Sequence, residues 1–279
     1  NINFAAESGS AEACIRVGEG TNATRYTCNV TGEGCTFDVP GAVAVKSYTG
    51  GDKNLTISKC TATAKAHSML QAKGIDGILV EEANVYSKNG LNFNNSNNVV
   101  VNNSNVDVKG YAVRFGEGSA ANGGAETYTI TNSSLKSSCD EAGDAVIVLR
   151  GTADKATLNI NNTTIEGNPQ IINNATDAKV SVDGAAIASS AEDLQAAIAA
   201  GNSAYLLAGN YTMPAVANKD LTISGSRNAI ITINKPNMSG SNITFEGVTV
   251  KGSGYATGVQ HVNTVTYNNV KVIGEMCLY

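Results

Sequence analysis

Carboxylates are the side chains from which this chain could build chemistry, as general acids and bases or as Ca²⁺ ligands. Five isolated aspartates stand at different positions of the repeat described below: Asp38, Asp52, Asp76, Asp107 and Asp154. We therefore expect them not to converge. The densest acidic stretch contains Asp140, Glu141 and Asp144. It is interpreted as a solvated loop that could hold Ca²⁺ weakly, because its spacing matches no standard calcium loop.

Basic and nucleophilic residues give no stronger motif. Arg16 and Arg114 share one local context and could grip an anionic sugar, or pair with the nearby Glu19 and Glu117. The two histidines lie far apart in sequence without a Ser or Cys nucleophile motif, and Cys-x-x-Cys spacing is absent. The sequence thus predicts no catalytic residues and no cofactor, and no metal beyond the acidic loop.

The composition favours short strands joined by tight turns. The 279 residues include 29 Gly and no Trp, are rich in Asn, Thr, Ser and Val, and are only 15% charged. A net charge of −5 argues against nucleic acid or an anionic membrane as partner. No apolar run is long enough to span a bilayer. Because the chain opens at Asn1 without a signal peptide, we expect a piece of a longer polypeptide.

One short pattern recurs along the chain and sets the positions of all these side chains. Residues 243–250 and 265–272 have the same pattern, and 22 residues separate Phe245 from Tyr267. A period of this length is typical of a solenoid, in which each coil buries its apolar side against its neighbours. Comparable anchor residues are Val30, Ile57, Val80, Val101, Ile130, Ile160, Val182 and Ile223.

Positions counted from each anchor predict the shape of a coil. Asn or Gly stands two residues after most anchors, which indicates a left-handed corner; Lys59 and Glu82 are exceptions expected to adopt another turn. A second strand follows in each coil, with apolar pairs such as Val113 and Phe115 or Val146 and Val148. The predicted fold is an all-β, right-handed parallel β-helix, because strand crossovers are strongly right-handed.

One segment, residues 190–201, breaks the repeat and reads as a short capping α-helix. Ser190 is the expected N-cap and Gly201 the expected C-cap. The helix, the apolar strand and Gly-x-Tyr of 204–211, and the stretch 221–226 together resemble the start of domains in the pectin-lyase-like superfamily of right-handed parallel β-helices. That superfamily includes lyases, hydrolases, phage tailspikes and non-enzymatic adhesins, so the resemblance implies a fold rather than an activity.

The helix divides the expected solenoid in two. Residues 1–183 are predicted to be the C-terminal part of a β-helix that lacks its N-terminal cap, and residues 184–279 to be the capping helix and first coils of a second one. Open solenoid ends expose unpaired strand edges. Either the chain belongs to a tandem array, or copies join head to tail, which we favour. The residues expected at this joint are Ile2, Phe4, Cys14, Met276, Cys277, Leu278 and Tyr279.

The cysteines fit this arrangement in part. Cys35 and Cys60 share a register and should be stacked free thiols, although Cys28 could instead pair with Cys35. A joint between copies would bring Cys14 close to Cys277, and an intermolecular disulfide could form there. Cys139 falls in a loop without an evident partner.

These patterns together indicate a non-enzymatic, extracellular, structural or adhesive β-helix of the bacterial surface type. Its expected partners are copies of itself or adjacent repeats, and surface glycans that ladders of Asn and Thr could hold by hydrogen bonds. The alternative is a polysaccharide lyase or glycoside hydrolase of the same fold, such as a tailspike. An enzyme would need convergent carboxylates on one exposed face.

Overall fold

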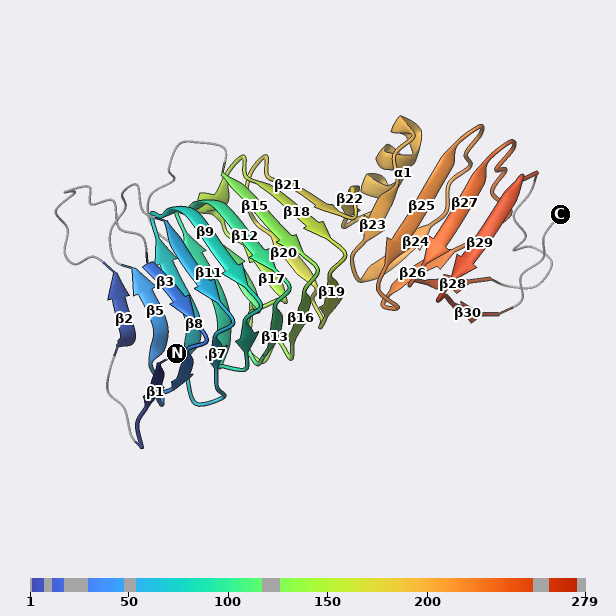
Figure 1. Cartoon of the computed structure of the whole chain (residues 1–279). Helices are drawn as coiled ribbons and strands as arrows, with labels where there is room; N and C mark the ends of the chain where they lie inside the picture. Colours follow the sequence, from blue (N-terminus) through green and yellow to red (C-terminus); the bar gives the residue numbers. More distant parts are fainter. Residues whose placement is uncertain are drawn as a thin grey trace. The chain divides into compact units, whose positions relative to one another are not determined.

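The computed structural model describes residues 2–7, 12–17, 30–47, 54–116, 126–252 and 261–274. The chain divides into two compact units, Asn1–Lys179 and Val180–Tyr279, which are described separately (Figure 1). Both consist mainly of parallel strands stacked coil upon coil, and one short α-helix lies in the second unit. The predicted fold class, a parallel β-helix with one short helix, is confirmed.

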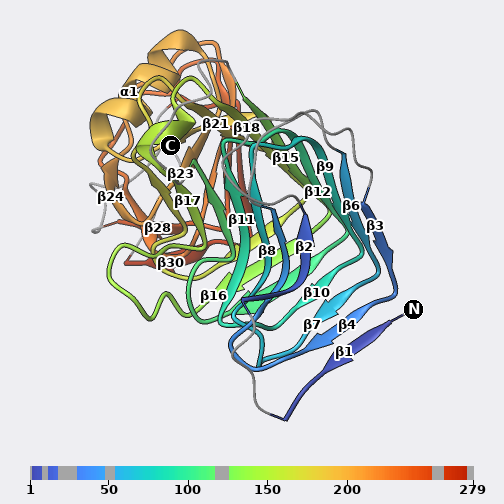
Figure 2. The same ribbon diagram turned by 90° about the vertical axis from the view of Figure 1, so that its left-hand side faces the viewer.

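Unit 1 winds through three parallel sheets that face one another across the core, as the view in Figure 2 shows. Sheet A contains β1 (Asn3–Ala5), β4 (Thr36–Asp38), β7 (Thr61–Ala62), β10 (Asn84–Val85), β13 (Asn105–Val108), β16 (Ser134–Ser137) and β19 (Thr164–Glu166). Sheet B contains β2 (Ala13–Val17), β5 (Val43–Ser47), β8 (Ser68–Lys73), β11 (Asn89–Asn94), β14 (Val113–Phe115), β17 (Ile147–Leu149) and β20 (Ile171–Asn173). Sheet C contains β3 (Val30–Glu33), β6 (Leu55–Ser58), β9 (Asp76–Glu81), β12 (Asn97–Asn102), β15 (Thr127–Thr131) and β18 (Thr157–Asn161).

The core of unit 1 is built from like residues in register. The anchors from Ile57 to Ile160 pair directly between neighbouring strands of sheet C, and all are buried. Aromatic rings stack in the same interior: 4.1 Å separates the ring centroids of Phe115 and Tyr128. Because alternate residues of a strand point to opposite faces, this register sends every other side chain of each coil to the surface.

Two register predictions are wrong by one or two residues. Val30 pairs with Leu55, so Gly32 rather than Val30 stands in line with the anchor Ile57. In β17, Ile147 and not Val146 pairs with Val113. Runs in which most residues are apolar leave the alternation ambiguous, and the pairing with neighbouring coils decides it.

The corners after sheet C are more uniform than the sequence suggested. Asn103, Asn132 and Asn162 have positive φ, as expected, and Gly34 has it as well. Lys59 (φ 54°) and Glu82 (φ 51°) also have positive φ. The prediction that these two adopt another turn is wrong. The Lys59 N–H donates to Glu81 O at 2.9 Å and the Glu82 N–H to Asn102 O at 3.1 Å, so bonds between coils hold the backbone in this region despite the side chain.

A column of small side chains follows these corners, and we call it the corner ladder. Its members are Cys35, Cys60, Ala83, Ser104, Ser133 and Thr163. Each hydroxyl in it donates to a carbonyl two residues earlier, as Ser133 Oγ does to Thr131 O at 2.7 Å. Each hydroxyl also accepts from the backbone of the preceding coil, as Ser133 Oγ does from the Ser104 N–H at 3.1 Å. The ladder satisfies buried polar groups within the wall of the solenoid.

Unit 2 has two parallel sheets and a helix. Sheet D contains β21 (Lys179–Val182), β22 (Ala185–Ala188), β23 (Ala204–Leu206), β25 (Asp220–Gly225), β27 (Asn242–Glu246) and β29 (Thr264–Asn268). Sheet E contains β24 (Gly209–Thr212), β26 (Ala229–Thr232), β28 (Thr249–Lys251) and β30 (Lys271–Ile273). The strands β21 and β22 form an antiparallel hairpin, whereas the other pairs of unit 2 are parallel.

The helix α1 (Ala191–Ala200) forms as its caps predict. Ser190 and Asp193 make a reciprocal capping box, and Gly201 ends the helix at φ 79°. Leu194 and Ile198 are buried in the core of unit 2, and the helix contacts β22, β23 and β24. The helix therefore covers the apolar side chains of the first coil of this unit.

Candidate functional site

The outer face of sheet A carries two rows of in-register side chains. The first row is short and polar: Asn3, Thr36, Thr61, Asn84, Asn105, Ser134 and Thr164. The second row lies two residues further along each strand or its extension: Asp38, Thr63, Tyr86, Asp107, Lys136 and Glu166. Parallel strands place successive members about 4.8 Å apart. Sheet A therefore presents a regular array of hydrogen-bonding groups.

The second row corrects one expectation about the aspartates. Asp38 and Asp107 do share a position in the coil, although three strand spacings, about 14 Å, lie between them. Asp38 is engaged locally, because Lys65 Nζ donates to Asp38 Oδ2 at 2.7 Å. This ion pair and a hydrogen bond from Thr63 lower the pKa of Asp38. The row brings Asp107 beside Lys136, and Lys136 beside Glu166.

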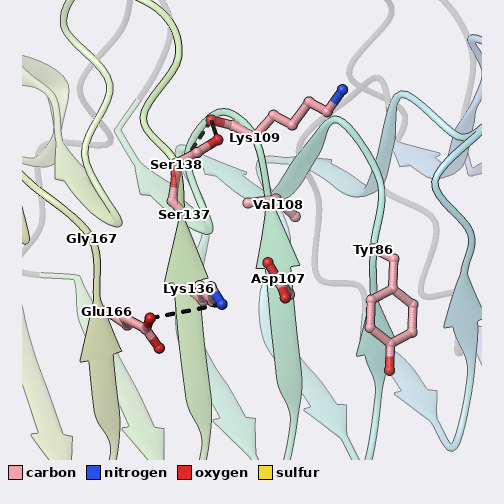
Figure 3. A pocket seen from close by; sticks show the side chains of 9 residues that line it. All are labelled: Tyr86, Asp107, Val108, Lys109, Lys136, Ser137, Ser138, Glu166 and Gly167. Carbon is pink, nitrogen blue, oxygen red and sulfur yellow. Dashed lines mark hydrogen bonds and ion pairs between the residues drawn. The ribbon is translucent and has the colours of Figure 1, made fainter.

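A groove lies at the end of these strands (Figure 3). It is lined by Tyr86, Asp107, Val108, Lys109, Lys136, Ser137, Ser138, Glu166 and Gly167. Tyr86 is 43% exposed, and the Asn105 amide donates to Tyr86 Oη at 3.4 Å. The Lys136 Nζ to Glu166 Oε1 distance is 3.7 Å, and both side chains are largely in solvent. Such an ion pair is weak, so a ligand could displace it at little cost.

The chemistry of this groove suits a polyhydroxylated ligand. It combines an exposed aromatic ring with two carboxylates, two ammonium groups and the Ser138 hydroxyl, whereas the Ser137 hydroxyl is buried and donates to Gly110 O. Its four charges cancel, so it has no overall preference for cations or anions. Donors and acceptors beside an aromatic ring are the groups that hydroxyl-rich molecules can bond and pack against.

A second group of charged side chains gathers over sheet B, and we call it the sheet-B cluster. It consists of His67, Lys88, Arg114, Glu141 and Asp144. Lys88 Nζ lies 2.7 Å from Glu141 Oε1. The Arg114 guanidinium stacks 3.9 Å from the centre of the Tyr111 ring and donates to Tyr111 Oη at 3.2 Å. Asp144 is 92% buried and its Oδ2 has no hydrogen-bond partner among the described residues.

The environment moves the titrations of this cluster in opposite directions. Lys88 lowers the pKa of Glu141 through a hydrogen bond and its charge. Burial raises the pKa of Asp144, and the neighbouring Glu141 adds to that rise. Burial and then the charge of Lys88 lower the pKa of His67. In this pair, one carboxyl group has a lowered pKa and the other a raised pKa. Such pairs are found at acid–base sites, and also in structural ion-pair networks.

The predicted calcium loop acquires other partners in the structure. Glu141 bonds Lys88, and Asp144 is buried while Asp140 is exposed. Across the residues that the structure describes, no three His, Cys, Asp or Glu side chains are grouped to hold a metal. The expected partners of Arg16 and Arg114, Glu19 and Glu117, lie outside the described residues. In the described part, Arg16 approaches Glu12 at 3.9 Å.

The residues predicted for the head-to-tail joint are only partly described. Ile2 is 58% exposed, and the ring of Phe4 stacks on Phe37 with centroids 5.1 Å apart. Cys14 is half-buried and free, and burial raises its thiol pKa. Met276, Cys277, Leu278 and Tyr279 lie outside the described residues, so the joint and its disulfide stay predictions.

The stacked thiols are as expected. Cys35 and Cys60 are buried and free, and the Cys35 N–H donates to Cys60 Sγ at 3.3 Å. Burial raises the thiol pKa of Cys60. The proposed alternative partner, Cys28, lies outside the described residues. Cys139 is free as well.

Sequence reasoning missed Tyr86, Lys136, Glu166 and Lys88. The first three could have been found, because they stand six residues after the anchors Val80, Ile130 and Ile160, one residue beyond the apolar core position of each coil. Lys88 could not, because the pattern does not tell which way the loop after β16 folds over sheet B.

The fold and the groove on sheet A define the chain as a parallel β-helix protein with a polar outer face. Comparisons with protein-family models, with curated proteins and with solved structures found no match to this chain. In the described part of the chain, no helix is long and apolar enough to cross a membrane.

Proposed function

We propose that the chain is a non-enzymatic, extracellular β-helix of the adhesin type, related in fold to the pectin-lyase-like superfamily, that binds surface glycans through sheet A. The observation that carries this proposal is the two-row array of sheet A ending in the groove around Tyr86. A rigid array with a repeat of about 4.8 Å can contact an extended polymer at several rungs at once. Many weak contacts then add up without any catalytic group.

The experiment for glycan binding is a panel of neutral and charged oligosaccharides measured by calorimetry. We expect Tyr86→Ala to weaken binding by roughly three- to tenfold, because it removes the only aromatic contact of the groove lining. Val100→Ala is the control, since Val100 is also exposed but lies on sheet C. Equal affinities of the two variants and the wild type would rule out the groove as the site.

Assembly through the solenoid ends is the second part of the proposal. Among the described residues, sheet A ends at β1 and sheet D at β29, each paired on one side. Ile2, just before β1, is 58% exposed, and Val272, in the end strand β30 of sheet E, is 47% exposed. Further strands of a copy, or of adjacent repeats, could add there. Electron micrographs that show filaments lengthening with concentration would support assembly between copies of the chain. Monodisperse particles at every concentration would exclude such assembly.

Polysaccharide cleavage is the second candidate function, and the sheet-B cluster favours it. Glu141 and Asp144 are two carboxylates with oppositely shifted pKa values beside Lys88 and Arg114. Release of sugar ends from acidic and neutral polysaccharides would test this function. Activity that disappears in both Glu141→Gln and Asp144→Asn would establish an enzyme, whereas activity unchanged in both would place any cleavage elsewhere.

A further inference from the structure

A second groove, separate from the one on sheet A, lies on the outer face of unit 2. The turn of the β21–β22 hairpin forms one wall, and the chain after helix α1 forms another. Strands β23, β25 and β27 provide the floor. Its volume is about 820 Å³, and its lining includes Asp183, Asn202, Ser203, Tyr205, Thr222, Ser224 and Glu246.

The floor of this groove is a register row. Tyr205 pairs with Ser224, and Ser224 with Glu246. Tyr205 and Glu246 are thus two strand spacings apart, about 10 Å, with a hydroxyl between them. Ser203 is fixed beside the row, because its Oγ accepts from the Thr222 N–H at 2.9 Å. The row places an aromatic side chain and a carboxylate on one line across the sheet.

The charge of this groove differs from that of the sheet A groove. Two carboxylates, Asp183 and Glu246, belong to its lining, and none of its described lining residues is Lys, Arg or His. Lys219 lies beside the lining residue Gly201, where its Nζ would be 2.7 Å from a β-carbon added to that glycine. The Glu246 carboxylate is held in place by the Asn268 amide, which donates to Oε1 at 2.9 Å. Glu246 therefore provides a negative charge at a fixed position in the groove.

We propose that this groove binds an amino sugar, with the protonated amine beside Glu246 and a sugar ring against Tyr205. A carboxylate has capacity for further hydrogen bonds from an ammonium group, and such charge-assisted bonds are about twice as strong as neutral ones. Hydroxyls that both donate and accept, as Thr222 and Ser224 do, match the hydroxyls of a sugar. Uronic acids should bind more weakly than the amine, because the two carboxylates repel their negative charge.

A sugar fits this geometry better than a basic peptide. An extended peptide usually adds along a sheet edge, where the backbone offers bonds. The floor here is the face of three central strands, whose backbone groups already pair with each other. Contacts must come from side chains, which are short hydroxyls, one ring and the carboxylates of Asp183 and Glu246.

The test uses the full chain and calorimetry with four probes: a glucosamine disaccharide, its fully N-acetylated form, a galacturonate disaccharide, and trilysine. We expect only the free amine to bind at neutral pH with measurable heat. Glu246→Gln should weaken that binding by about tenfold, as expected for loss of a charge-assisted hydrogen bond. Tyr205→Ala should weaken it as well, since the ring contact is lost.

The matched control is Glu192→Gln, which removes the same charge from the exposed first turn of helix α1, outside the groove lining. It should bind like the wild type. Circular dichroism and thermal melting verify that each variant is folded. The proposal is overturned if Glu246→Gln binds the glucosamine disaccharide as tightly as the wild type does, or if the N-acetylated disaccharide binds equally well. Stronger binding of trilysine than of the glucosamine disaccharide would assign the groove to basic peptides instead. Because Tyr86 lies in unit 1, Tyr86→Ala separates this site from the one on sheet A.

Discussion

Single residues in this protein depart from their usual preferences where the stacked coils hold them in place. Lys59 and Glu82 adopt the left-handed backbone that glycine and asparagine prefer. The cost of this conformation for a side chain with a β-carbon is roughly 1–2 kcal/mol. Backbone hydrogen bonds to the next coil accompany both residues. A residue's own propensity is therefore a poor guide wherever the preceding and following coils have fixed the path of the chain.

Glu126 is a buried residue whose titration should affect stability. It is 3% exposed, and burial raises the pKa of its carboxyl above the ordinary value, although the Tyr128 hydroxyl partly offsets the rise. The folded chain then holds a proton that the unfolded chain releases above its ordinary pKa of about 4.5. Glu126 therefore makes folding less favourable as the pH rises beyond that value.

We predict that Glu126→Gln raises the free energy of unfolding at pH 7 by about 1 kcal/mol, because it removes the cost of a buried charge and keeps the shape. The gain should shrink as the pH falls below 4.5, where the carboxyl is protonated in both states. Urea unfolding at several pH values measures it. Glu166→Gln, an exposed carboxyl, is the control. A gain that does not change with pH would contradict the assignment to ionisation.

The elements of this chain are held together by the corner ladder as well as by their apolar faces. The ladder runs from Cys35 to Thr163, but Ala83 interrupts it because a methyl group cannot accept from the Cys60 N–H. The next rung is present, since the Ala83 N–H donates to Ser104 Oγ at 3.1 Å. The position next to Cys60 is therefore a gap in an otherwise continuous column.

Ala83→Ser should fill this gap. Its hydroxyl can accept from the Cys60 N–H and donate to Glu81 O, as Ser104 Oγ does to Asn102 O at 2.9 Å. We predict a gain of about 1 kcal/mol in the free energy of unfolding, measured by denaturant melts. Ala62→Ser is the control: Ala62 is fully buried and lies inside β7, off the ladder, so a hydroxyl there should destabilise. A loss of stability in Ala83→Ser as large as that in Ala62→Ser would refute the ladder.

The sequence predicts these elements well where one residue type recurs at one position, as at the anchors Val80 and Val101 and the corners Asn103 and Asn132. Prediction is weaker in strands that are apolar on both faces, and the register of β17 was misjudged for that reason. Neither pattern nor spacing could place the loop that brings Glu141 to Lys88. That contact joins residues from separate coils through a segment with no repeat.

At the scale of the whole molecule, each coil of unit 1 is a modular part of the stack. Val80 and Val101 are 21 residues apart and pair directly, so residues 82–102 span one coil. Stability in solenoids is close to a sum over coils and their interfaces. Removing one whole coil should therefore shorten unit 1 without changing its path.

We predict that deletion of residues 82–102 leaves a folded chain with the same far-ultraviolet circular dichroism per residue and a melting temperature lower by several degrees. The deletion joins Glu81 to Asn103, which has the same left-handed corner as Glu82. Deletion of residues 82–91, about half a coil, is the control and should unfold unit 1, because it removes the corner and strand β10 and joins the end of β9 to the middle of β11, which belongs to another sheet. Equal damage from both deletions would show that the coils are not modular.

The corner ladder also gives unit 1 a polarity. Its backbone N–H groups donate in one direction along the stack, from Ser104 to Ser133 and from Ser133 to Thr163. The side-chain amides of asparagines beside the ladder donate in the opposite direction, from Asn162 to Asn132 and from Asn132 to Asn102. Turning the column end over end would reverse both sets of dipoles, so its two ends are chemically distinguishable. At the ladder position, a strand added at one end meets a donor where a strand added at the other end meets an acceptor, so the two ends favour different partners.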